Sequence, residues 1–142
     1  MINRVHESTA TGDLLAKHVI GLAMKVHRAL GCGFLESIYV NALVLELQEN
    51  GLSFEREKRF SVTYRGTEIG YFIADLVIDN RLIVEMKAVD ALAIAHSVQL
   101  VNYLAVSKIE LGLLLNFSPK SLEFKTKTRL YSKMPEPPQL QS

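Results

Sequence analysis

Hydrophobic residues recur with two different periods along the chain, and the change of period separates predicted helices from predicted strands. In residues 11–30 the apolar side chains return at helical spacing, and Thr11 and Gly31 are suited to begin and end that helix. After a short glycine-containing joint, residues 34–50 show a second helical stripe, which an Asn-Gly pair ends. We therefore expect a helical pair at the N-terminal end of the chain.

The pattern then changes to that of strands. Residues 60–64 alternate apolar and polar side chains, as in a half-buried strand, and a turn follows at residues 65–67. Residues 69–78 and 82–86 are rich in apolar and β-branched side chains, with polar residues between them. These two segments predict a hairpin.

The remaining sequence predicts one helix and one or two strands. Asp90 is a good N-cap for a helix over residues 91–106, which contain neither Gly nor Pro. The stripe expected on this helix comprises Leu92, Ala95, Gln99, Asn102 and Val106. Residues 111–115 are continuously apolar, which is typical of a strand buried on both faces, and residues 122–130 predict an edge strand.

The order of elements is therefore helix, helix, three strands, helix, strand and an optional last strand, or ααβββαβ(β). This order implies an α/β protein of the α+β type, in which helices flank a central mixed β-sheet of about four to five strands. The 142 residues have room for one domain, for which we expect residues 1–132. The proline-rich residues 133–142 predict a flexible tail.

Composition narrows the classes of function. The formal charge of +1 excludes a protein that is basic throughout, so contact with nucleic acid would need a local basic patch. The single Cys32 excludes a disulfide framework and a four-cysteine metal site. The polar N-terminus and the lack of a long apolar run predict a cytoplasmic protein that neither is secreted nor enters a membrane. Candidate basic patches are Arg56, Lys58, Arg59 and Arg65, and Lys120, Lys125, Lys127 and Arg129.

Asp75, Glu85 and Lys87 form the most informative pattern. Glu85 and Lys87 are two positions apart in a predicted strand, so their side chains project from one face. Asp75 joins them if the hairpin loop has an odd length, such as residues 79–81, whereas a two-residue loop would turn Asp75 to the opposite face. The alternative is a solvated Glu-Lys pair, but the apolar surroundings are those of a central strand, where charges need a partner or a metal.

Two further groups share helical faces. Gln99 and Tyr103 follow His96 on one face of the third helix, and they could equally form a polar stripe that packs on the sheet. Glu36 and Tyr39 share a face at the start of the second helix, where the helix dipole favours an acidic residue without any function.

Together these residues resemble the PD-(D/E)XK nuclease superfamily, which has the restriction-endonuclease-like fold. Asp75, Glu85 and Lys87 match its D…ExK element, although Ala74 stands where the family name has proline. Two more elements are similar to patterns within that superfamily: Gly33, Glu36 and Tyr39 to the GxxExxY branch, and Gln99 and Tyr103 to the QxxxY signature of RecB-like nucleases.

The resemblance implies a Mg²⁺- or Mn²⁺-dependent nuclease that hydrolyses phosphodiester bonds of nucleic acid, with DNA favoured, in repair, recombination or mobile-element biology. It implies that Asp75, Glu85 and the carbonyl group of Met86 bind the metal, with Glu36 as a further ligand directly or through water. Lys87 would orient the attacking water and offset transition-state charge, and Gln99 and Tyr103 would position the phosphate.

Two other interpretations stay open. One is a module of the same fold that binds nucleic acid or protein but has lost catalysis. The other is a nuclease that is active only as a subunit, because the modest charge of the chain predicts weak binding to nucleic acid by the isolated protein. Whether the protein forms a homodimer or a larger complex is not decided by the sequence.

Overall fold

The computed structural model describes residues 4–129, and their side chains from residue 13 onward. Its elements are α1 (Arg4–Leu30), α2 (Glu36–Glu49), β1 (Phe54–Tyr64), β2 (Thr67–Ile78), β3 (Leu82–Lys87), α3 (Ile94–Ser107), β4 (Leu111–Phe117) and β5 (Leu122–Thr128). This order, ααβββαββ, is the predicted one with the optional last strand present. The predicted tail, residues 133–142, and the domain boundary at 132 lie outside the described residues.

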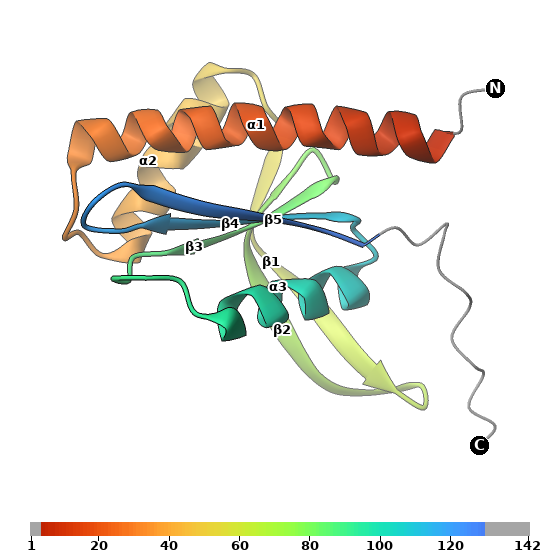
Figure 1. Cartoon of the computed structure of the whole chain (residues 1–142). Helices are drawn as coiled ribbons and strands as arrows, with labels where there is room; N and C mark the ends of the chain where they lie inside the picture. The colour runs from red at the N-terminus through yellow and green to blue at the C-terminus, as the bar shows by residue number, and fades with distance from the viewer. Residues whose placement is uncertain (1–3, 130–142) are drawn as a thin grey trace.

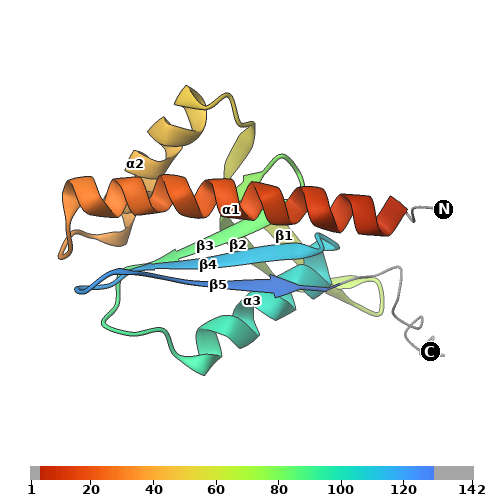
Figure 2. The ribbon, with the colours of Figure 1, turned by 45° about the horizontal axis from the view of Figure 1, so that its top comes forward.

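The five strands form one mixed sheet in the order β1-β2-β3-β4-β5. Three neighbouring pairs are antiparallel, and β3 and β4 are parallel because α3 carries the chain back between them. In Figures 1 and 2 the helices α1 and α2 cover one face of the sheet and α3 lies on the other. The predicted class, a mixed sheet flanked by helices, is confirmed.

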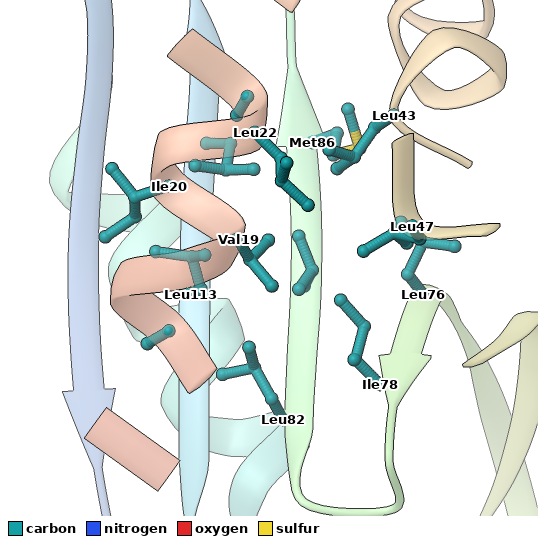
Figure 3. Close-up of a cluster of buried hydrophobic side chains, with 14 of the residues drawn as sticks. Val19, Ile20, Leu22, Leu43, Leu47, Leu76, Ile78, Leu82, Met86 and Leu113 are labelled. Atoms are coloured by element: carbon teal, nitrogen blue, oxygen red, sulfur yellow. The ribbon is translucent and has the colours of Figure 1, made fainter. Parts of the chain in front are cut away.

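The main core lies between the sheet and the two N-terminal helices. Figure 3 shows Val19 and Leu22 of α1 above Leu113 of β4, with Leu47 of α2 facing Leu76 of β2. Val84 and Met86 of β3 belong to this cluster, so the neighbouring residues of β3 are turned to the opposite face. Residues 111–117 of β4 are all buried, as predicted for a strand that is covered on both sides.

A smaller core lies under α3. Leu100 and Leu104 pack there against residues of β2, β3 and β4. Gly112 of β4 permits this close approach, because an added Cβ atom would lie 2.9 Å from Cγ of Leu100. The helix is thereby held close to the sheet.

Several predicted boundaries were wrong. Helix α1 begins at Arg4 instead of Thr11, since no glycine or proline interrupts residues 4–10. Helix α3 begins after Ala93 instead of Asp90, because His96 Nδ1 accepts the N–H of Ala93 and closes the first turn there.

Two further sequence patterns misled the prediction. Strand β1 includes Phe54 and the charged residues 55–59, which the sequence had not indicated as a strand. The buried positions of α3 are Ser97, Leu100 and Leu104, so the predicted stripe through Gln99 and Asn102 is wrong. Among the helices of the described chain, none is long and apolar enough to span a membrane.

Candidate active site

Strands β2 and β3 part at Asp75 and Glu85, and the two carboxylates take over the main-chain hydrogen bonding there. The backbone pairing of β2 with β3 starts at Ile78↔Leu82, next to the three-residue loop 79–81, and ends at Leu76↔Val84. Beyond it, the N–H of Met86 donates to Asp75 Oδ2 at 2.8 Å, and the N–H of Asp75 donates to Glu85 Oε1 at 3.3 Å. Each carboxylate is thus anchored to the opposite strand, and the odd loop places Asp75 beside Glu85.

Asp75 also lies where the alternation of β2 is broken. Leu76 packs on the α1–α2 side of the sheet, whereas Ala74, two positions away, packs under α3. On the neighbouring strand β1, Arg56 pairs with Leu76 and Lys58 pairs with Ala74. Glu57 lies between these two pairs and has a positive φ of 49°. This local irregularity reverses the side of the sheet to which successive side chains of β2 point, and the reversal occurs at Asp75.

Lys87 is the last residue of β3 and pairs with Asn116 of β4. Asn116 was not identified from the sequence as part of the site. Asn116 is fully buried, its Oδ1 accepts the N–H of Val89, and its Nδ2 donates to the carbonyl of Val89 and to Glu123 Oε1. The side chain therefore fixes the segment that follows Lys87. A buried Asn at the end of an apolar strand was the available signal, because such an amide needs partners.

Tyr39 of α2 ties down the joint in front of Glu36. Its ring is fully buried and stacks on Phe117 at 4.3 Å between centroids. Its hydroxyl donates to the carbonyl of Gly31 at 2.6 Å and accepts the N–H of Phe34 at 3.4 Å. Gly33 has a φ of 98°, which favours glycine in this joint. Glu36 in the first turn of α2 is thereby held at a defined place near the ends of β3 and β4.

The side chain of Tyr103 reaches the same region from α3. Its ring is parallel to that of Phe72, 3.7 Å away between centroids. Burial raises the pKa of its phenol, and the charges of Glu85 and Asp75 raise it further. Gln99 is exposed, and no hydrogen bond holds it within the described residues. The structure therefore places Tyr103 where the charges of the two carboxylates act on its phenol, whereas no hydrogen bond links Gln99 to them within the described residues.

The electrostatics of the site are dominated by crowded carboxylates. Glu85 is only 7% exposed, and its burial raises the pKa of its carboxyl group to about 8, with the charge of Asp75 adding to this and Lys87 opposing it. Loss of solvent around the carboxyl of Glu36 likewise raises its pKa, although the residue as a whole is exposed, and the charge of Asp75 adds to that shift. A positive charge bound between these groups would offset the repulsion between their carboxylates.

Comparison with known proteins now decides the family. The sequence model of the PD-(D/E)XK nuclease superfamily matches residues 13–129, which include α1 from residue 13 onward and every later element up to β5. The chain belongs to the PD-(D/E)XK nuclease superfamily. The match does not distinguish branches, so the similarity to GxxExxY proteins stays a prediction.

A solved structure agrees with the fold of this superfamily member. The crystal structure of SSO0001 aligns with a TM-score of 0.52 and 21% sequence identity, over 66% of this chain and 49% of that chain. This chain therefore spans about half the length of SSO0001, and the likeness shows the fold alone. The curated proteins gave no match.

The donor set of this PD-(D/E)XK protein suits a hard divalent cation only in part. Asp75 and Glu85 bring carboxylate oxygens together where β2 and β3 part, and oxygen ligands are those that Mg²⁺ prefers. Within the described residues, however, no three Asp, Glu, His or Cys side chains are gathered as a metal site. The structure thus supports a two-carboxylate site and does not place Glu36 as a third direct ligand.

Acidic neighbours offset part of the predicted basic patch on β1. Arg56 donates to Asn41 Oδ1, Lys58 pairs with Glu55 at 3.1 Å, and Arg59 pairs with Glu68 at 2.7 Å. Lys58 and Arg59 therefore offer less free positive charge than the sequence suggested, whereas Arg56, whose partner Asn41 is neutral, keeps its charge.

Tyr39→Phe tests whether the hydroxyl holds the joint before Glu36. We expect the free energy of unfolding to fall by about 1 kcal/mol, because two hydrogen bonds are lost while the ring stack on Phe117 remains. Amide hydrogen exchange should rise at Phe34 and in the first turn of α2. Tyr71→Phe, at an exposed tyrosine, serves as the control. Unchanged exchange at Phe34 would show that the hydroxyl does not order this joint.

Proposed function

We propose that the protein is a divalent-metal-dependent nuclease that hydrolyses phosphodiester bonds of DNA. The observation that carries this proposal is the reciprocal anchoring of Asp75 and Glu85 at the point where β2 and β3 part, with Lys87 on the same face of β3. The buried carboxylate of Glu85 lies beside that of the half-buried Asp75, an arrangement that contributes little to stability without a counter-charge, and a bound cation explains why the two groups lie together.

Each residue has a role that its place supports. Asp75, Glu85 and the carbonyl group of Met86 would hold Mg²⁺ or Mn²⁺, and Glu36 would act on it through water. The cation, when bound, supplies Lewis-acid polarisation of the phosphate.

The remaining groups act on the substrate and the nucleophile. Lys87 orients the attacking water and offsets the charge that develops on the phosphate oxygens. Tyr103, whose raised pKa keeps its phenol protonated, donates a hydrogen bond to the phosphate. Gln99 lies one helical turn before Tyr103 and would reach the substrate only from the exposed surface of α3.

Cleavage assays with labelled single- and double-stranded DNA test the proposal. We expect nicking or degradation with Mg²⁺ or Mn²⁺, and none with EDTA. Protein that binds DNA in the presence of Ca²⁺ but cuts no substrate with Mg²⁺ or Mn²⁺ would favour a module without catalysis. Cleavage that appears only with an added partner protein would favour a nuclease subunit.

A further inference from the structure

A hollow of about 290 Å³ lies at the C-terminal end of α1, beside the turn that joins β4 and β5. Figures 1 and 2 show that this turn, the end of α1 and the end of β3 all lie at the same end of the sheet's strands. The hollow is outside the candidate active site and is lined by Met24, His27, Arg28, Lys120, Ser121 and Leu122.

The ionisable side chains that line the hollow are all basic. Neither Arg28 nor Lys120 forms an ion pair within residues 13–129, in contrast to Lys25, Lys58 and Arg59. Arg28 lies in the last turn of α1, where the helix dipole alone favours a cation. Lys120 lies in a turn instead, and no dipole accounts for it. Since the formal net charge is only +1, two unpaired cations at one hollow are a local excess that suits an anion.

The wall of the hollow is held in place by His27. Its Nε2 lies 2.8 Å from the carbonyl oxygen of Ser118, so this nitrogen carries the proton and donates it. The ring of His27 also stacks near Phe117, at 5.9 Å between centroids. The turn that carries Lys120 is thus fixed to the end of α1 that carries Arg28, before any ligand binds.

The same turn lies beside the segment that follows Lys87. Lys120 and Ser121 also line a second hollow of about 420 Å³, together with Asp90 from the segment that follows Lys87. Asn116, which lies beside Lys87 in the sheet, precedes this turn by two residues. A nucleic-acid strand that passes this turn would therefore meet Lys120 near the segment that follows Lys87, and Arg28 on the other side of the turn.

We propose that Arg28 and Lys120 bind a backbone phosphate of the nucleic-acid strand, separate from the phosphate that is cut. Met24 and Leu122 give the hollow an apolar part against which the adjoining sugar or base packs. This inference rests on the proposed function, because it assigns part of the same substrate to a second contact. The site contributes to substrate affinity and position, and not to the chemical step.

Binding measurements on the full chain test this site. Fluorescence anisotropy with labelled DNA, in Ca²⁺ and at several salt concentrations, should show affinity lowered roughly three- to tenfold by Arg28→Ala and by Lys120→Ala. Each substitution should make the salt dependence of binding shallower by about one unit. In cleavage assays KM should rise while kcat stays the same. Lys17→Ala, at an exposed lysine of α1 that does not line this hollow, is the matched control.

The outcomes separate this inference from the proposed function. Wild-type affinity and salt dependence in the double variant Arg28→Ala, Lys120→Ala would overturn the phosphate site and leave the nuclease proposal intact. If the wild-type protein binds no DNA, the proposed function fails, and the assignment to a nucleic-acid strand fails with it. An NMR titration with inorganic phosphate then shows whether the hollow binds a free anion, through shifts of the Ser121 and Leu122 amides. Phosphate bound as tightly as DNA would likewise overturn the assignment to a strand.

Discussion

Replacing Lys87 with alanine is expected to lower turnover by about 10²- to 10⁴-fold, which is the usual scale for a positioned electrostatic or acid–base group. Lys87 lies on the same strand as Glu85 and its charge opposes those of Glu85 and Glu36. Its loss removes a positive charge from the reacting phosphate but no metal ligand, so metal affinity should stay similar or rise. Single-turnover cleavage of labelled DNA gives the rate, and calorimetry with Mn²⁺ gives the affinity.

Two variants make the Lys87 experiment specific. Lys17→Ala removes an exposed lysine from α1 and should leave turnover unchanged. Lys87→Arg keeps the charge and tests whether charge alone is enough, since the guanidinium group has a different shape. A module without catalysis predicts a different result for Lys87→Ala: weaker DNA binding with a salt dependence shallower by about one unit, and no cleavage to lose.

Glu85→Gln is expected to abolish Mn²⁺ binding and, without metal, to stabilise the fold at neutral and alkaline pH. The folded-state pKa of Glu85 is about 8, above its ordinary value of 4.5, so the folded protein holds a proton more tightly than the unfolded chain does. Stability of the metal-free wild type should therefore fall as the pH rises from about 4.5 to 8. The variant lacks this loss and should be more stable by about 1–3 kcal/mol near pH 8, with little difference at pH 4.

Denaturant unfolding across this pH range, with and without Mn²⁺, measures both effects. Mn²⁺ should raise the stability of the wild type and not that of Glu85→Gln or Asp75→Asn. Glu49→Gln, at an exposed position near the end of α2, controls for the loss of one acidic group. Equal Mn²⁺ affinity in the wild type and both site variants would show that the two carboxylates serve only the structure.

The central part of the candidate site could be predicted because it depends on local periodicity. Glu85 and Lys87 share a face since side chains alternate along a strand. The odd loop at residues 79–81 then fixes the register that brings Asp75 to Glu85, as the pair Leu76↔Val84 shows. In both cases the information lies within a few residues of the sequence.

Other parts depend on contacts between distant segments, which periodicity does not encode. Asn116 holds Val89 across 27 positions of sequence, and His27 holds the turn at Ser118 across 91. The charged start of β1 looked unlike a strand because it lies at the edge of the sheet, where charges remain solvated. The hydroxyl of Tyr39 bonds to Gly31 and Phe34 in the joint before α2. These contacts could not be predicted from the helical face that Tyr39 shares with Glu36.

The buried amide of Asn116 also has a consequence for the order in which the protein folds. Asp75, Glu85 and Lys87 all precede α3, but the residue that fixes the segment after Lys87 lies at the end of β4. Parallel pairing of β3 with β4 closes a long loop, and such pairings form slowly. A growing chain therefore carries its three central charged residues well before it can hold them in their final arrangement, and the site matures only when β4 docks.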